Sequence, residues 1–190
     1  PAATSTPAAA NAASAAKLPA KLADRVTQYK AKQAVTLVAA EETKLKGTCK
    51  AAQAKVQALA TKTDAANTAR TKIYSDITKQ ITAIIARLTD ADVDTKDLQA
   101  ANTQLTKLIA QYQTDYTNFK TGLADISELD CITDPTAFKA ALLTARTDRA
   151  TLVADATAIR EYIPTVKQSL AQAKAALATD STTSTEEATQ

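Results

Sequence analysis

The sequence predicts an all-α fold: a long antiparallel helical hairpin, or an elongated three- or four-helix bundle with coiled-coil-like packing. Of 190 residues, 44 are Ala and only two are Gly, so the best helix former is abundant and the commonest interior helix breaker is nearly absent. Large apolar residues recur at steps of three, four and seven, as on a helix face. No stretch alternates apolar and polar residues as a strand does.

We expect a helical bundle over residues 18–178 with a polar tail at each end. Residues 1–17 form an Ala/Ser/Thr/Pro tract, and residues 179–190 contain no apolar residue larger than Ala. Both ends are typical of disordered or stalk-like tails, although a neighbouring copy of the chain could hold them. The helical segments between them are expected at about 20–46, 50–88, 95–130 and 135–178.

The first two expected segments, 20–46 and 50–88, both lie in a basic, Ala-rich part of the chain. Segment 20–46 places Leu22, Val26, Tyr29 and Leu37 roughly along one face, and segment 50–88 carries isoleucines at steps of three and four. Gly47 either ends the first segment or loosens one continuous helix through both. The sequence leaves these two alternatives open.

The third and fourth segments have clearer starts. Asp94, with Asp97 three residues later, predicts an N-cap with a capping-box-like acid. Asp134 followed by Pro135 predicts a cap with proline in the first helical turn. Pro164 inside the fourth segment removes a hydrogen bond and predicts a kink.

The fourth segment has the strongest heptad pattern, which predicts a long helix packed along a seam. Two rows repeat every seven residues along its length. The first row is Phe138, Ala145, Leu152, Ile159, Val166 and Ala173, and the second row is Leu142, Arg149, Ala156, Ile163, Leu170 and Leu177. The large apolar residues expected in this packing seam are Phe138, Leu142, Leu152, Ile159, Ile163, Val166, Leu170 and Leu177.

The two cysteines, Cys49 and Cys131, are 82 residues apart and belong to no short metal or redox motif. Their midpoint is residue 90, inside the polar turn between the second and third segments. A hairpin folded there brings the cysteines level, and a four-helix bundle places both at one end. We therefore expect a disulfide, which indicates an oxidising compartment.

Composition excludes several catalytic classes. Without His there is no Ser-His-Asp or Cys-His catalysis and no imidazole metal site. Two Gly residues cannot form a Gly-rich phosphate loop. The triad Asp90, Asp92 and Asp94 lacks the Gly and Glu that a calcium loop needs further on. We therefore expect no enzyme activity, no cofactor and no metal.

Charge is unevenly divided along the chain. Residues 1–88 carry 14 basic and 5 acidic side chains (net +9), whereas residues 89–190 carry 9 and 15 (net −6). The two parts attract each other, which favours a folded-back hairpin or head-to-tail association of copies. The lysines around residues 44–55 lack the interleaved aromatics of a nucleic-acid site, and no apolar run is long enough for a transmembrane segment.

Three short stretches carry a resemblance. They are residues 49–56 (CKAAQAKV), residues 84–88 (IIARL) followed by Val93-Asp94-Thr95 and Leu98, and residues 155–160 (DATAIR). Over roughly residues 49–170 the chain resembles a group of uncharacterised secreted helical proteins of ultra-small, host-dependent bacteria of the candidate phyla. The resemblance implies an exported envelope or surface protein with a helical hairpin and paired cysteines, and no catalytic residues.

These observations favour a secreted, non-enzymatic structural protein. We expect a helical rod that self-assembles, as a homo-oligomer or filament, or that builds an envelope or surface layer with other envelope proteins. An extracellular helical binding module (an adhesin, a chaperone-like or a ligand-sequestering protein) is the alternative. The abundance of Thr and Ala also raises ice binding, but no regular Thr repeat supports it.

Overall fold

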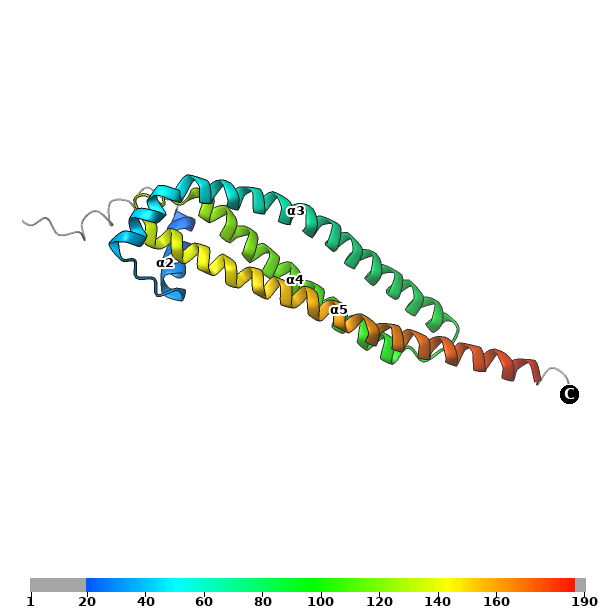
Figure 1. Ribbon diagram of the computed structural model, residues 1–190. Coiled ribbons are helices and arrows are strands. Elements are labelled where there is room, and N and C mark those ends of the chain that lie inside the picture. Colours follow the sequence, from blue (N-terminus) through cyan, green and yellow to red (C-terminus); the bar gives the residue numbers. More distant parts are fainter. Residues whose placement is uncertain (1–19, 187–190) are drawn as a thin grey trace, which may run out of the picture. The chain divides into compact units, whose positions relative to one another are not determined.

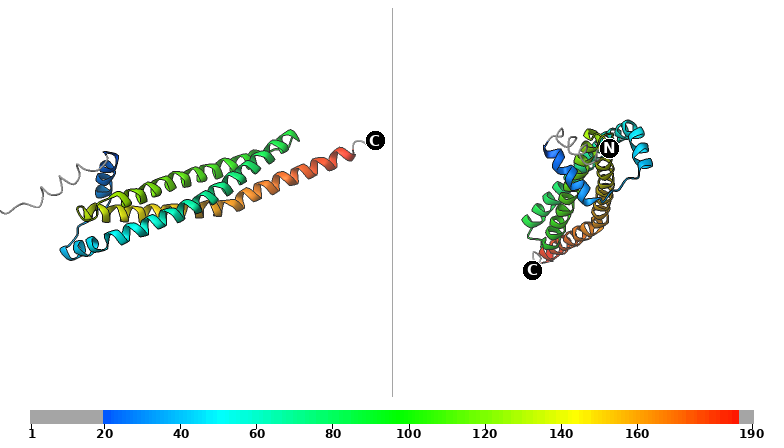
Figure 2. Two further views of the ribbon diagram at one scale, coloured as in Figure 1. Left: turned by 90° about the horizontal axis from the view of Figure 1, so that it is seen from above. Right: turned by 90° about the vertical axis from the view of Figure 1, so that its left-hand side faces the viewer.

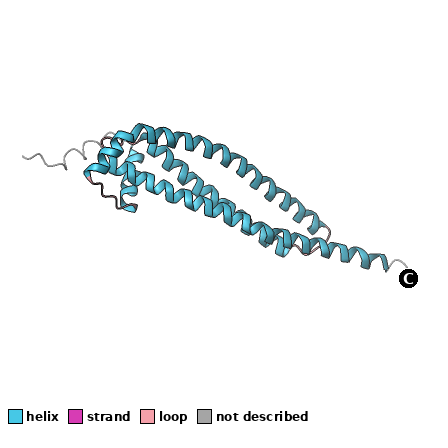
Figure 3. Ribbon diagram, viewed as in Figure 1, coloured by secondary structure: helices cyan, strands magenta, loops and turns pink. Residues whose placement is uncertain are grey.

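The computed structural model of the protein describes residues 20–186, with side chains from 21 to 178, and confirms the all-α class. Every regular element in this part of the chain is a helix, joined by short loops (Figure 3). The described residues form two compact units. The first unit comprises residues 20–65 and 116–150, and the second comprises residues 66–115 and 151–186.

Four helices make up the described chain: α2 (Ala20–Lys32), α3 (Ala39–Asp90), α4 (Lys96–Glu128) and α5 (Pro135–Glu186) (Figure 1). Parts of α3, α4 and α5 contribute to both units, whereas α2 belongs to the first. Within each unit the parts of α3, α4 and α5 run beside one another, whereas α2 lies across the direction of the other helices of the first unit (Figure 2). The first unit is thus built from four helices and the second from three.

The expected boundary between the first two segments is wrong. The chain leaves the helix after Lys32 and re-enters it at Ala39, whereas Gly47 lies inside α3. The break contains Val35, Thr36 and Val38, whose β-branched side chains lose rotamer freedom in a helix. Neither alternative for Gly47 therefore describes the chain: the helix neither ends there nor runs unbroken from residue 20.

Replacing Gly47 by Ala is expected to raise the free energy of unfolding by about 1 kcal/mol, because Gly in a helix interior costs about that much relative to Ala. A Cβ at this position meets nothing within 4 Å, so no steric penalty opposes the gain. Urea denaturation followed by circular dichroism measures the change. The reverse substitution at the exposed Ala58 of the same helix, Ala58→Gly, should lower the free energy of unfolding by a similar amount. An unchanged denaturation midpoint for Gly47→Ala would contradict the placement of Gly47 in the interior of α3.

The end of the fourth segment also differs from the expectation. Helix α5 continues to Glu186, into the stretch expected to be a polar tail from residue 179. This stretch holds neither Gly nor Pro up to Glu186, so nothing in it stops an established helix. Pro164 lies inside α5 and the helix continues on both sides of it. The expected tail at residues 1–17 and the last residues, 187–190, lie outside the described chain.

The turns that join α3 to α4 and α4 to α5 are held by hydrogen bonds. At the end of α3, the backbone N–H of Val93 donates to Leu88 O at 3.0 Å and that of Asp92 to Thr89 O at 3.0 Å. Asp92 has a positive φ of 56°. This pattern is a Schellman motif, in which the buried Val93 packs near the last turn of the helix.

The caps of α4 and α5 were largely predicted. Asp134 Oδ1 accepts from the N–H of Ala137 at 2.9 Å, directly before Pro135 at the start of α5. Before α4 the cap is one residue later than expected. The carbonyl of Thr95 accepts the first helical bond, from Gln99, while Asp94 accepts from the N–H of Lys96 at 3.0 Å.

The core of each unit follows the predicted apolar faces. In the first unit, Leu22, Val26 and Tyr29 of α2 are buried with Phe119 and Phe138. In the second unit a row of buried residues from each helix meets: Ile81 and Leu88 of α3, Leu98, Leu105, Ile109 and Tyr112 of α4, and Leu152, Ile159, Val166 and Ala173 of α5. Ala145 and Ala173 allow close approach of the helices where they are buried.

The two rows of the expected seam differ in burial. Phe138, Leu152, Ile159 and Val166 are buried, whereas Leu142, Ile163 and Leu170 are half-buried and Leu177 is 37% exposed. Arg149, which shares the second row, is exposed. In the second unit two neighbouring helices cover one face of α5, so the second row lies at the margin of that face.

Candidate functional site

The first unit contains a cross-link between α3 and the loop that precedes α5. Cys49 and Cys131 lie at disulfide distance, with their Cα atoms 5.8 Å apart, and both are buried. That separation is within the usual range for a disulfide. The cross-link closes a loop of 82 residues, which comprises most of α3 and all of α4.

Beside the cross-link, a buried carboxylate joins α2 to α4. Asp125 is 1% exposed. Its two oxygens accept from Arg25 Nε and Nη2, each at 2.6 Å, and one also accepts from the Tyr29 hydroxyl at 2.5 Å. A bidentate guanidinium–carboxylate pair is among the strongest charge-assisted arrangements in proteins. We call these three residues the Asp125 cluster.

The electrostatics of the Asp125 cluster keep Tyr29 protonated. Burial raises the pKa of the Tyr29 phenol well above its usual range, and its hydrogen bond to the Asp125 carboxylate raises it further. The hydrogen bond to the same carboxylate also raises the pKa of Arg25. The Tyr29 hydroxyl is therefore a fixed hydrogen-bond donor, which makes the cluster a structural anchor rather than an acid–base pair.

A buried glutamine completes the packing at the end of α4. Gln53 of α3 is 9% exposed, and its Nε2 donates to Leu129 O at 2.8 Å, Ser127 O at 3.2 Å and Ile126 O at 3.3 Å. These carbonyls end a helix and have no intrahelical partner. Gln53 therefore caps α4 from a neighbouring helix.

Tyr29 was expected only as a residue of the apolar face of its helix, and roles for Arg25, Gln53 and Asp125 were not predicted from the sequence. One signal was available. Arg25 and Tyr29 are four residues apart, on the same side of a helix whose other face positions are Leu22 and Val26, so a buried acid opposite them could be expected. Nothing in the sequence identifies that acid as Asp125, which is 100 residues away.

Part of the interior of the second unit is polar, and several of its buried polar atoms lack hydrogen-bond partners. Arg70 Nη1 donates to the Tyr112 hydroxyl at 3.3 Å and lies 5.6 Å from its ring centroid, while Tyr74 packs edge-on against the same ring at 5.7 Å. Four buried side-chain oxygens of this unit have no hydrogen-bond partner: Asn67 Oδ1, Thr71 Oγ1, Asn102 Oδ1 and Asp155 Oδ2. Buried polar atoms left without a partner destabilise a fold.

Asp155 of α5 faces a second carboxylate. Burial raises its pKa, and its hydrogen bond and repulsion with Asp115 of α4 raise it further. Asp115 also accepts from Gln111 Nε2 at 2.6 Å. The pair forms an acidic contact between two helices, and ionisation of Asp155 works against folding.

We expect Asp155→Asn to raise the free energy of unfolding by about 1 kcal/mol at pH 7, because the amide can donate to Asp115 where a carboxylate repels it. A carboxyl whose pKa is higher in the folded than in the unfolded protein stabilises the fold when it is protonated. This stabilisation is complete below the unfolded-state pKa, near 4, and is lost as the pH rises through the folded-state pKa. The gain should therefore disappear below about pH 4. Urea denaturation at pH 3.5, 5 and 7 measures it; a gain that is equal at all three pH values contradicts the carboxyl–carboxyl contact.

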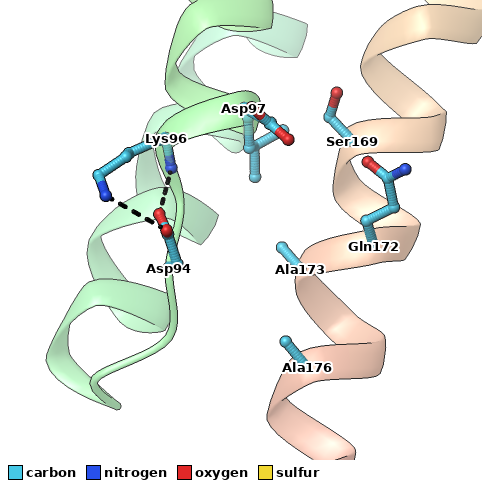
Figure 4. A pocket seen from close by; sticks show the side chains of 8 residues that line it. Asp94, Lys96, Asp97, Ser169, Gln172, Ala173 and Ala176 are labelled. Carbon is cyan, nitrogen blue, oxygen red and sulfur yellow. Dashed lines mark hydrogen bonds and ion pairs between the residues drawn. The ribbon is translucent and has the colours of Figure 1, made fainter.

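Two neighbouring hollows of the second unit lie between α4 and α5. One, of about 260 Å³, is lined by Asp97 at the start of α4 and by Ser169, Gln172, Ala173 and Ala176 of α5 (Figure 4). The other, of about 350 Å³, shares Asp97, Ser169 and Gln172 and extends to Tyr162. Figure 4 shows Asp94 turned back onto Lys96. Asp94, Lys96 and Asp97 bring charge to the first hollow, whereas small and amide side chains make up most of the second. The hydroxyl of Ser169, which lines both, donates to Thr165 O at 3.2 Å.

A third hollow of the second unit, also of about 350 Å³, lies between α3 and α5. Arg70 and Tyr74 line it from α3, and Val153 and Arg160 from α5, with Ala156 and Thr157 between them. Val153 is 58% exposed. This surface, which we call the two-arginine groove, combines positive charge with exposed apolar groups.

The described residues, 20–186, contain neither a metal-binding cluster nor a membrane-spanning helix. Among them, no three His, Cys, Asp or Glu residues are placed to hold a metal ion. None of the described helices is long and apolar enough to cross a membrane. In the lysine-rich part of α3, Lys46 pairs with Glu42 at 2.5 Å. The pKa of Asp130 is lowered mainly by the hydrogen bond from the backbone N–H of Ile132, and Lys50 lowers it a little further.

Comparison with protein-family models, with curated proteins and with solved structures finds no match. The fold and its contacts define an all-α protein with a cysteine cross-link and a buried ionic anchor in one unit. What it does has to be inferred from these features.

Proposed function

We propose that this protein is a non-enzymatic structural protein that acts outside the reducing cytoplasm and assembles with copies of itself through α5. The observation that carries the proposal is the second heptad row of α5 in the second unit. Ile163 and Leu170 are half-buried and Leu177 is 37% exposed, although their spacing is that of a coiled-coil contact position. A helix from another copy would cover them.

The compartment is inferred from the cysteines. Cys49 and Cys131 lie at disulfide distance, and structural disulfides persist in secreted and extracytoplasmic proteins. The resemblance to secreted helical proteins of candidate-phyla bacteria supports the same compartment. An envelope or surface layer is the assembly that fits such a location.

Charge supports contact between copies. Lys167 and Lys174 lie on α5 within one turn of Ile163 and Leu170, and residues 89–190 carry a net charge of −6 against +9 for residues 1–88. Basic and acidic surfaces of different copies attract each other, and salt screens this attraction. Covering three half-exposed side chains contributes only a few kcal/mol, so assembly should be weak, concentration-dependent and strongest at low salt.

The test compares molar mass across concentration by sedimentation and light scattering, at low and at high salt. We expect the mass of the wild-type chain to rise with concentration at low salt, and the double variant Leu170→Ser, Leu177→Ser to stay monomeric. Leu59→Ser is the matched control, because Leu59 of α3 is 38% exposed and lies outside the row. A wild-type chain that is strictly monomeric at high concentration and low salt overturns the proposal.

A helical binding module remains the second candidate. The two-arginine groove favours it, because it joins positive charge and exposed apolar surface in one hollow. Assembly through α5 and binding in this groove are separable, since they use different side chains.

A further inference from the structure

We propose that the two-arginine groove binds the anionic head and the first part of the chain of a fatty carboxylate. The inference is independent of self-assembly. It rests on three properties of the groove: two cationic side chains without a carboxylate partner, exposed aliphatic groups beside them, and a hollow large enough for a small molecule.

The two arginines are available for an anion. None of the ion pairs among the described side chains includes Arg70 or Arg160. Arg70 is held by neutral contacts to Tyr112, through one hydrogen bond and its position near the ring. These contacts orient the guanidinium without neutralising it. A guanidinium presents paired N–H donors that match a carboxylate.

The apolar part of the groove lies beside the charges. Val153 lines it and is 58% exposed, and Ile73, one turn along α3 from Arg70, is 57% exposed. Ala156 leaves space between the helices, and Tyr74, whose ring packs on Tyr112, lines the α3 side. Large aliphatic side chains left in water favour a ligand with an aliphatic chain.

The size and charge of the groove select the class of ligand. Its volume of about 350 Å³ is within the range of small-molecule sites. No carboxylate lines it, so a cationic amphiphile would meet only like charge. A neutral alcohol of the same length would gain the apolar contact but not the two charge-assisted hydrogen bonds, which are about twice as strong as neutral ones.

The test uses octanoate as the probe and the full-length, ¹⁵N-labelled chain in the oxidised state. We expect saturable amide shifts confined to residues around 70–74 and 153–160. Octanol should bind about tenfold more weakly, and octylamine should not shift these amides. Octyl phosphate in a parallel titration distinguishes a carboxylate from a phosphate head; tighter binding of the phosphate would overturn the assignment to a carboxylate.

Substitutions locate the site. Arg160→Gln should weaken octanoate binding about tenfold, and Val153→Ser about threefold to fivefold. Arg87→Gln is the matched control, because Arg87 is an exposed arginine of α3 in the same unit that does not line the groove, and its affinity should equal that of the wild type. Circular dichroism of each variant checks folding. Shifts that do not saturate, or equal losses for Arg160→Gln and Arg87→Gln, overturn the proposal.

Discussion

Removing the Cys49–Cys131 cross-link is expected to lower the free energy of unfolding by about 4.5 kcal/mol. The cysteines are 82 residues apart, and closing a loop of that length removes about this much conformational entropy from the unfolded chain. For a chain of this size, the loss corresponds to a fall of roughly 10–15 °C in the melting temperature. The effect is large because most of α3 and all of α4 lie within the closed loop.

Thermal unfolding of the oxidised protein, the reduced protein and the double variant Cys49→Ser, Cys131→Ser measures this effect. Both altered forms should melt at similar temperatures, well below the oxidised form, and the reductant should not change the variant. Alkylation before and after reduction checks the bond itself. Two free thiols in the native protein would contradict the cross-link.

The second large effect is expected from Asp125→Ala, which should lower the free energy of unfolding by about 3 kcal/mol. The substitution leaves Arg25 and the Tyr29 hydroxyl without their shared acceptor inside a packed interface. The Arg25 side chain is 32% exposed, so water partly solvates it after the change. Because of this solvation, the expected loss is at the low end of the range for substitutions that remove one partner of a buried ion pair.

A matched control separates this effect from the loss of any surface carboxylate. Asp76 pairs with Lys72 at 2.6 Å on the exposed surface of α3, and Asp76→Ala should leave the free energy of unfolding nearly unchanged, because solvent screens exposed ion pairs. A double-mutant cycle of Asp125→Ala with Tyr29→Phe measures the coupling within the Asp125 cluster. A loss below 1 kcal/mol for Asp125→Ala would contradict its role as the anchor of α2.

Features that depend on local spacing were predicted well from the sequence. The symmetric position of Cys49 and Cys131 about the turn near residue 90 placed them level, and α3 and α4 indeed meet at that turn. The Asp134–Pro135 pair marked the start of α5 because both residue types have fixed conformational roles there. The class of the fold followed from Ala and from the scarcity of Gly.

Features that depend on competition between weak preferences were predicted poorly. Gly47 was a plausible place for a helix to end, but one Gly costs only about 1 kcal/mol within a long helix. The helix instead breaks at the segment that contains the β-branched residues Val35, Thr36 and Val38. The Asp125 cluster was missed because Asp125 lies 100 residues from Arg25 and 96 from Tyr29 in the sequence. A pairing of that range depends on how helices pack, which residue spacing does not encode.

The candidate sites also depend on how the helices pair, which residue spacing does not reveal. Arg70 and Arg160 are ordinary surface residues in the sequence, and only the pairing of α3 with α5 brings them to one hollow. The carboxyl contact between Asp115 and Asp155 likewise arises from the pairing of α4 with α5. Heptad spacing predicted which face of α5 is buried, but not which polar groups are brought to it.

The cross-link also divides the molecule into a covalent ring and two pendant arms. Residues 49–131 form the ring, whereas the covalent connection of α2 and α5 to it runs only through the backbone at its two ends. The bond therefore gives no direct hold on α2, which depends on the Asp125 cluster and its buried apolar face. Reducing the cysteines and detaching α2 are thus separate events, because they break contacts between different residues.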